Sequence, residues 1–260
     1  MSESENDNPE LNVDGTQAIR RAAAILRRIG QGDGQGVGLS AITDTVRLPR
    51  STTHRILKCL VEEGLVRHDK ERRRYMVGRL TYELSLAVTP DTLEIGRWRV
   101  AIDRTAQRTG VTSYLLSRSG IEATCLLKTD GNAVIRVIPV EVGQRRLLGV
   151  GAGSTALLAA LDPDTCERII RTIAPLLSSH NSLTEETIRR LVAETRETGF
   201  AVSRSNVVRD AIGIGMAIPA KEGSPTLAVS IAGLASQADD AVVNRWKQII
   251  REEIEAVLES

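Results

Sequence analysis

Hydrophobic residues recur every three or four positions in the first part of the chain, the spacing that places them on one face of a helix. Residues 16–29 show this pattern and predict a first helix, followed by a loop with five glycines in nine residues at 30–38. A second helix is predicted from Ser40, as its N-cap, to Val46. A third is predicted over 49–63, with Pro49 at its first position and Gly64 at its C-terminal end.

Two short segments after the third helix predict a β-ribbon. Residues 65–69 and 73–77 are strand-like, and a charged turn joins them. Helical spacing then returns at 79–88 and from about 91 to 109. Three helices followed by a ribbon is the element order of a winged helix-turn-helix.

Beyond Gly110 the pattern changes to short strand-like segments separated by turns. Strands are predicted at 112–117, 122–129, 133–140 and 145–151, followed by helices at 154–161, 162–177 and 183–199, strands at 200–204, 214–220 and 226–234, and a closing helix at about 238–258. This order differs from the regular βαβ alternation of a doubly wound sheet. It predicts an α+β fold, with a largely antiparallel sheet and helices on one face or at its ends.

Length and composition are those of an ordinary globular protein with two domains, 260 residues of which 42% are hydrophobic. No hydrophobic run approaches the length of a membrane span, and the acidic start MSESENDNPE is unlike a signal or transit peptide. The cysteines Cys59, Cys125 and Cys166 are odd in number and far apart, which argues against a disulfide framework and a CxxC-type metal site. We therefore expect a cytoplasmic protein with no membrane partner and no cofactor.

Charge is unevenly distributed along the chain. Residues 1–15 carry a net charge of −5 and are expected to form a disordered tail. Residues 16–79 carry +8, whereas residues 80–260 carry −2. One short segment is thus strongly basic, which indicates a polyanionic partner for that segment alone.

The third predicted helix has two distinct faces. On a helical wheel Leu57 and Leu60 lie on one side, and Ser51, Arg55 and Lys58 lie on the other. A basic face with small hydroxyl residues can approach DNA closely and reach phosphates and guanine edges. A solvated face is the alternative for an isolated helix, but the helix-turn-helix order and the arginine-rich ribbon favour DNA binding. The predicted DNA-binding residues are Arg50, Ser51, Thr52, His54, Arg55, Lys58, Arg72, Arg73 and Arg74.

The segment LSAITDTVRLPRSTTHRILKCLVEEGLVRHDKERRRYMVGRLTYELS, residues 39–85, resembles the N-terminal domain of IclR-type transcription regulators. It has that family's Leu-Ser start of the second helix, its Leu-Pro-Arg-Ser-Thr turn into the recognition helix, and its Tyr-x-Val-Gly end of the wing at Tyr75 to Gly78. The segments AQRTGVTSYL, LLGVGAGSTALLAAL, ETGFAVSRSN and TLAVSIAGLASQ resemble the family's second domain.

This resemblance implies a one-component transcription regulator that binds double-stranded operator DNA and responds to a small-molecule effector. It implies a winged helix-turn-helix domain at 16–78, linker helices at 79–109, and a GAF-like or profilin-like effector-binding domain at 110–260. It also implies that subunits pair into a homodimer or homotetramer. The chain departs from the family's pattern at 149–155, so the resemblance names no effector.

The segment GVGAGS, residues 149–154, follows a predicted strand and opens a predicted helix. It fails the dinucleotide fingerprint, because its third glycine comes two residues after the second rather than three. The N–H groups at this helix N-terminus could hold a carboxylate, or the glycines could only allow helix and sheet to pack closely. Gly213 and Gly215 could leave room for a ligand, or they could only allow close backbone packing. The predicted effector is a carboxylate or an aromatic catabolite. The predicted effector-binding residues are Gly151, Ala152, Gly153, Ser154, Asn206, Asp210, Gly215 and Ser230.

An enzyme with an accessory winged helix is the alternative class. Its mark would be a nucleophile–base pair or a metal cluster, and the sequence suggests neither. The only histidines are His54, His68 and His180, and Cys125 lies in an apolar segment that favours a core role over a nucleophile. A winged helix used for protein contacts would have a neutral exposed face, whereas this face is basic. We therefore predict a regulator rather than an enzyme.

Overall fold

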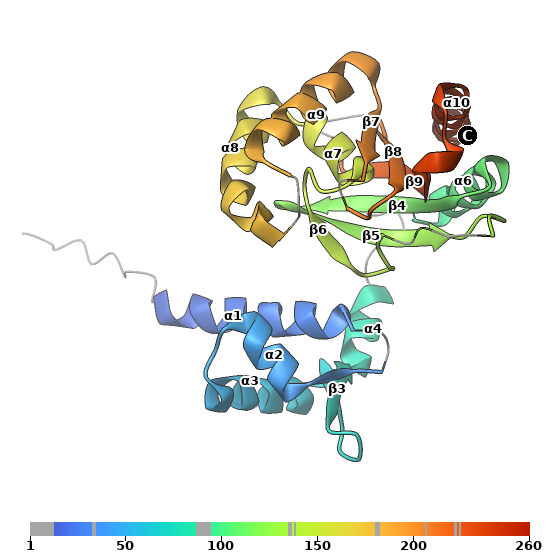
Figure 1. The fold of residues 1–260 in the computed structure, drawn as a ribbon. Coiled ribbons are helices and arrows are strands. Elements are labelled where there is room, and N and C mark those ends of the chain that lie inside the picture. The colour runs from blue at the N-terminus through green and yellow to red at the C-terminus, as the bar shows by residue number, and fades with distance from the viewer. Residues whose placement is uncertain are drawn as a thin grey trace, which may run out of the picture. The chain divides into compact units, whose positions relative to one another are not determined.

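The chain folds into two compact units, Met1–Thr89 and Pro90–Ser260 (Figure 1). A computed structural model describes residues 13–32, 35–86, 95–134, 137, 139–179, 183–205, 207–220, 223 and 225–260. Both units combine helices with an antiparallel sheet, which confirms the predicted α+β class. Among the described residues, no helix is both long and apolar enough to cross a membrane.

The first unit is a three-helix core with a small sheet. Its helices are α1 (Val13–Gly30), α2 (Leu39–Val46), α3 (Arg50–Glu62) and α4 (Arg79–Leu86), and its strands are β1 (Val37–Gly38), β2 (Val66–Asp69) and β3 (Arg74–Val77). The strands pair antiparallel in the order β1-β3-β2. Ile25, Ile42 and Leu57, one from each of the first three helices, are fully buried against one another. The apolar stripes predicted for these helices therefore form one core.

Three local predictions for this unit need correction. The glycine-rich loop contains β1, because Val37 pairs with Tyr75 and so adds a third strand to the wing. The N-cap of helix α2 is Gly38, two residues before the predicted Ser40. Helix α3 has Pro49 as its N-cap rather than its first residue. Its predicted end is confirmed, since Gly64 adopts φ +72° and donates its N–H to the carbonyl of Val61 at 3.1 Å.

A six-stranded antiparallel sheet forms the centre of the second unit. Its strands are β4 (Thr112–Ser119), β5 (Glu122–Thr129), β6 (Arg145–Leu147), β7 (Ala201–Arg204), β8 (Ala211–Ala217) and β9 (Leu227–Leu234), in the order β6-β5-β4-β9-β8-β7. The strand predicted at 133–140 is wrong, since none of its described residues lies in a strand. Val137 and Val140 are nevertheless buried, so their hydrophobicity reflects burial in the core, and Pro139 has no N–H for a sheet.

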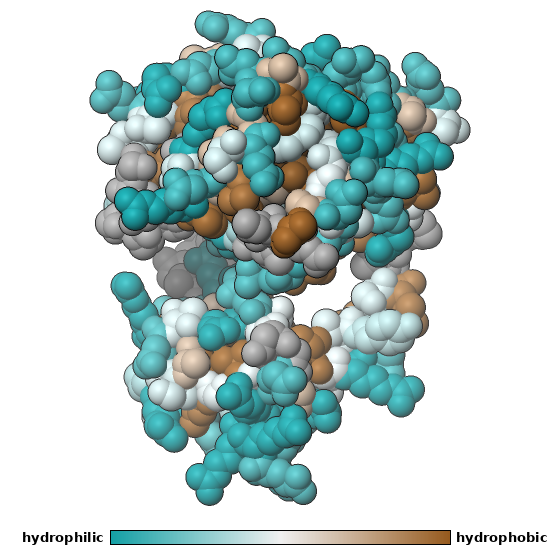
Figure 2. All heavy atoms as spheres, turned by 45° about the vertical axis from the view of Figure 1, so that its right-hand side comes forward, coloured by the Kyte–Doolittle hydropathy of each residue, from teal (hydrophilic) through white to brown (hydrophobic). Residues whose placement is uncertain are grey.

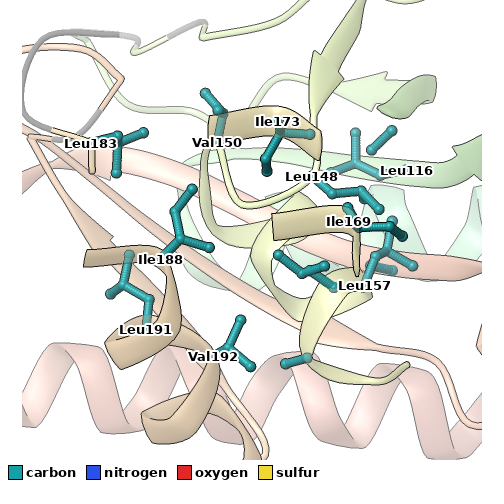
Figure 3. Close-up of a cluster of buried hydrophobic side chains, with 14 of the residues drawn as sticks. Leu116, Leu148, Val150, Leu157, Ile169, Ile173, Leu183, Ile188, Leu191 and Val192 are labelled. Carbon is teal, nitrogen blue, oxygen red and sulfur yellow. The ribbon is translucent and has the colours of Figure 1, made fainter. Parts of the chain in front are cut away.

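Helices cover both faces of this sheet (Figure 1). One face carries α7 (Ala152–Ala159), α8 (Pro163–Ile173) and α9 (Glu185–Thr198), and a 3₁₀ turn at Ala174–Ser179 follows α8. The other face carries α6 (Ile95–Thr109) and α10 (Asp240–Leu258), and a 3₁₀ turn at Ala235–Gln237 precedes α10. Figure 3 shows part of the core between the sheet and the helices α7, α8 and α9, which contribute Leu157, Ile169 and Ile188 in that order. The sheet is therefore buried on both sides.

Helix α6 belongs to the second unit, although we expected it to form part of a linker at 79–109. Its Trp98 and Ile102 are buried beneath the sheet, and Arg108 forms an ion pair with Glu253 of α10 at 2.8 Å. Helix α4, the other part of that segment, lies in the first unit. There the hydroxyl of Thr81 donates a hydrogen bond to the carbonyl of Leu65, the residue before β2. Residues 87–94 lie outside the described part of the chain.

Helix α7 lies unusually close to strand β8. Every residue of α7 is buried, and four of the eight are Ala or Gly. Alternate residues of β8 face the helix, and a Cβ placed on Gly215 would lie 2.7 Å from the backbone of Ala152 and Gly153. Gly215 therefore serves close packing, which was one of the two roles that the sequence left open for it.

We expect Gly215→Ala to destabilise the second unit by about 1–3 kcal/mol, because the added methyl group must push a helix backbone away from the sheet. Gly96→Ala is the control, since its Cβ would meet nothing within 4 Å and should change stability by less than about 1 kcal/mol. Urea unfolding followed by tryptophan fluorescence measures this unit alone, because Trp98 and Trp246 both lie in its core. Equal stability of the two variants would contradict the close contact.

Candidate functional sites

Helix α3 presents the predicted reading face to solvent. Its core side holds Thr53, Leu57 and Leu60, all buried. Of the six predicted DNA-binding residues on this helix, Thr52 is half-buried and the other five, Arg50, Ser51, His54, Arg55 and Lys58, are exposed. Lys58 lies 3.8 Å from Glu62, one turn further on, and Arg55 has no such partner among the described residues. Arg55 is thus the basic group in the middle of this face that is free to reach a ligand.

The three arginines of the wing differ from one another. Arg74 donates to the carbonyl of Gly36 at 2.8 Å, and Arg72 reaches the side chain of Gln35 at 3.4 Å, so both tie the wing to the glycine-rich loop. Arg73 is exposed, has φ +53°, and has no hydrogen-bond or ion-pair partner among the described residues. The carboxylate of Asp69 accepts the N–H of Arg72, which orders the turn and holds the pKa of Asp69 below its usual range.

A shallow hollow lies between the start of α3 and the wing. It is lined by Leu39, Arg50, Ser51, His54, His68, Lys70, Arg73 and Tyr75, with no acidic residue among them. The rings of His68 and Tyr75 stack at 4.4 Å and form its floor. Figure 2 shows hydrophilic side chains gathered at the end of the first unit that carries the β2–β3 turn. This surface has the charge and the shape to receive a phosphate backbone.

A pocket in the second unit lies where the N-terminus of α7 meets the sheet. Its apolar wall comes from Leu116, Val140, Val150 and Val207, and its cavity volume is about 70 Å³. The polar groups that line it are the side chains of Tyr114, Arg146, Ser154, Ser203, Ser205 and Ser230. A mainly apolar cavity with a few convergent polar groups is the usual form of a small-molecule site.

The polar groups of the pocket are held in different ways. The hydroxyl of Ser154 donates back to the carbonyls of Val150 or Gly151, at 2.6 and 2.9 Å, so it steadies the turn into α7. The hydroxyl of Tyr114 donates to the carbonyl of Val137 at 3.3 Å, and burial holds the pKa of Tyr114 above its usual range. Burial lowers the pKa of Arg146, an effect that the nearby Tyr114 opposes.

The structure brings most of the predicted effector residues together. Gly151, Ala152, Gly153, Ser154 and Ser230 all line the pocket, as does Gly213. Two predicted residues do not line it: Gly215 packs against α7, and Asp210 is exposed in the turn before β8. Asn206 lies outside the described residues.

Sequence reasoning missed four polar residues of the pocket, Tyr114, Arg146, Ser203 and Ser205. A signal for Arg146 was present, since two consecutive arginines in a strand must point to opposite faces, and one of them then faces the inside. No comparable signal distinguishes Tyr114 or Ser203, because the chain beyond Gly110 has many short strands and their neighbours were unknown.

Two family models match this chain. A model described as the IclR helix-turn-helix domain matches residues 18–70, and a model described as the bacterial transcriptional regulator IclR C-terminal domain matches residues 95–258. The second match alone covers more than half of the chain. The protein belongs to the IclR family. It is therefore a DNA-binding transcriptional regulator with an N-terminal helix-turn-helix.

Several IclR-type proteins are similar along most of their length. The HTH-type transcriptional regulator TtgV of Pseudomonas putida is 30% identical over 200 residues, 72% of this chain and 70% of that protein. The glycerol operon regulatory protein of Streptomyces coelicolor is 26% identical over 84% of each chain. The crystal structure of an IclR regulator from Alicyclobacillus acidocaldarius has a TM-score of 0.76 at 23% identity, covering 93% of this chain and 97% of that one, which shows a shared fold.

Reactive side chains in the IclR-type second unit are few. Burial raises the pKa of Cys125 to about 12, which leaves almost no thiolate near neutral pH. Cys166 is also buried, and His54 and His68 lie in the first unit, while His180 is outside the described residues. Within the described parts of the chain, no three His, Cys, Asp or Glu side chains gather in a group that could hold a metal ion.

We expect alkylation of the native protein by iodoacetamide near pH 8 to modify Cys59 alone. Cys59 is exposed on α3, whereas Cys125 and Cys166 are buried and their pKa values are raised. Peptide mass spectrometry measures the modified fraction at each position, and unfolding in guanidinium chloride provides the control in which all three react. Rapid native modification of Cys125 would contradict the core assignment and reopen a nucleophilic role.

Proposed function

We propose that this regulator binds its operator through α3 and the wing, and that a small molecule in the α7 pocket changes that binding. The observation that carries the effector part is the pocket itself, a cavity with apolar walls and convergent polar groups at a helix N-terminus. The ligand is a small carboxylate or an aromatic catabolite. An IclR homolog from Microbacterium hydrocarbonoxydans, whose crystal structure contains 4-hydroxybenzoate, supports a compound of this kind.

On DNA, the residues of the first unit divide by role. Ser51, Thr52, Arg55 and Lys58 lie in the major groove, with Arg55 reading a base edge and the hydroxyl groups allowing close approach. Arg50, His54 and the free Arg73 hold phosphates around the basic hollow. Arg72 and Arg74 support the wing through their bonds to the glycine-rich loop and reach DNA with the remaining donors of their guanidinium groups.

A physical path leads from the pocket to the segment that joins the two units. Strand β4 has Tyr114 and Leu116 in the pocket, and Leu115 between them points to the opposite face. There Leu115 lies in the same core as Trp98 and Ile102 of α6. A ligand that shifts β4 therefore shifts α6, the helix that follows the connecting segment. In a homodimer or homotetramer, such a shift resets the spacing of two DNA-binding units.

We expect Arg55→Ala and Arg73→Ala to weaken DNA binding in different ways. Loss of Arg55 removes a base contact and should cost about 1–3 kcal/mol on the preferred sequence, with little change on unrelated DNA. Loss of Arg73 removes a phosphate contact, so it should weaken binding to all sequences and reduce the slope of log K against log salt by about one. Fluorescence anisotropy with an operator selected from random duplexes, over a series of salt concentrations, measures both effects.

Arg190→Ala is the matched control for these variants, because it removes an exposed arginine of α9 in the second unit. It should leave operator affinity and the salt slope unchanged. If Arg55→Ala keeps full affinity and selectivity, the assignment of α3 as the reading helix is wrong.

We expect Val207→Trp to abolish the response to effector while operator binding without effector persists. Val207 lines the pocket and is only half-buried, so a larger side chain fills the cavity without disrupting the core. In the wild type, a compound that stabilises the second unit should change operator affinity by about 5- to 150-fold, the usual range of coupling between two sites. Thermal-shift screening of small carboxylic acids and aromatic catabolites finds the compound, and anisotropy measures the coupling.

Leu176→Trp serves as the control, since Leu176 is 48% exposed in the 3₁₀ turn at Ala174–Ser179, outside the pocket and away from β4 and α6. It should keep the response of the wild type. A compound that binds the second unit tightly yet leaves operator affinity unchanged would argue against effector control.

A further inference from the structure

Arg146 is the one charged side chain among the described residues that line the α7 pocket. It lies on β6 opposite Ala123 of β5, and Ala123 also lines the pocket. Residues paired across an antiparallel ladder share a face of the sheet, so Arg146 projects to the pocket side. Its neighbour Arg145 has the opposite orientation and donates to Glu122 at 2.8 Å. The two arginines are chemically alike, but Arg145 has an anionic partner and Arg146 has none among the described residues.

The side chain of Arg146 is half-buried and has no hydrogen-bond or ion-pair partner among the described residues. Its Nε atom is buried and has no hydrogen-bond acceptor, and no ion pair joins Arg146 to any described residue. The described residues that line the cavity include no acidic side chain. Removing a charged donor from water without an acceptor is costly, which is why buried charges in proteins are normally paired. A ligand in the pocket would supply an acceptor that the described residues do not provide.

We propose that Arg146 is the counter-ion for the carboxylate of the effector, so that the pocket selects a small organic acid over a neutral molecule of the same shape. The inference rests on the proposed function of this pocket and selects one of its two ligand classes. A guanidinium and a carboxylate form two parallel hydrogen bonds in a fixed geometry, which gives orientation as well as affinity.

The remainder of the pocket fits the rest of such a molecule. The first N–H groups of α7 have no acceptors within the helix, and its N-cap Gly151 has no side chain that could accept from them, so they add donors for an anion. Leu116, Val140 and Val150 offer an apolar surface for a hydrocarbon part. The cavity of about 70 Å³ is several times the ~10–15 Å³ that one water molecule needs, which fits an acid with few non-hydrogen atoms in its enclosed part.

Matched pairs of probes test the charge of the ligand directly. Acetate, propanoate and benzoate are compared with acetamide, propanamide and benzamide, which have the same shapes and no charge. Thermal unfolding of the full chain is measured with each probe at millimolar concentration and constant ionic strength set with sodium chloride. We expect the carboxylates to raise the Tm above the chloride reference and the amides to leave it unchanged.

Variants of the two neighbouring arginines locate the effect. Arg146→Gln should weaken binding of the best carboxylate by about 10-fold or more, and Arg146→Lys should retain part of the affinity. Arg145→Gln is the matched control, and it should bind the carboxylate within about twofold of the wild type, because Arg145 faces away from the pocket. Arg146→Met should raise the Tm of the ligand-free protein, because it removes an unpaired buried charge; a lower Tm would show that the charge has a partner and overturn the proposal.

The inference is overturned if no carboxylate raises the Tm above the chloride reference, if amides stabilise as well as acids, or if Arg146→Gln keeps wild-type affinity. Its failure can be told apart from failure of the proposed function. A neutral compound that binds in the pocket and changes operator affinity would support effector control and contradict the carboxylate site at Arg146. Carboxylate binding that depends on Arg146 but does not affect operator affinity would support the carboxylate site and contradict effector control.

Discussion

The close contact between α7 and β8 is the constraint on which the second unit depends. A helix that is buried on all sides can approach a sheet this closely only where both surfaces lack large side chains, and Gly215 and Ala152 meet that condition. The same approach brings the N-terminus of α7 over the sheet and encloses the pocket between them. Packing and binding are thus two results of one arrangement, in which Gly215 packs against α7 and Gly213 lines the pocket.

In the first unit, a single helix likewise serves both packing and binding. Helix α3 buries Leu57 in the core and presents Arg55 on its other side, so the same thirteen-residue helix both stabilises the unit and carries its reading face. The wing is held by bonds from Arg72 and Arg74 to the glycine-rich loop. That loop supplies a third strand to the wing sheet, which fixes a ribbon that would be marginal as a two-stranded hairpin.

Arg146 shows how a side chain without hydrogen-bond or ion-pair partners can indicate a binding site. Two other polar side chains of the pocket, Ser154 and Tyr114, donate their hydroxyl groups to backbone carbonyls. The guanidinium of Arg146 has no partner among the described residues, and its burial weakens the charged form. A group in this state costs stability in the free protein, and an anionic ligand would offset that cost.

The sequence by itself determined the elements with strong periodicity. The three helices, the ribbon, the basic reading face and the α+β order all follow from local spacing, because a helix or strand faces its core with a fixed period. Only the tertiary structure decided which distant segments meet. It separated the roles of Gly213 and Gly215, excluded Asp210 from the pocket, placed α6 in the second unit, and distinguished Arg146 from Arg145 by the partners each one finds. These outcomes depend on contacts between residues far apart in the chain, and periodicity carries no information about such contacts.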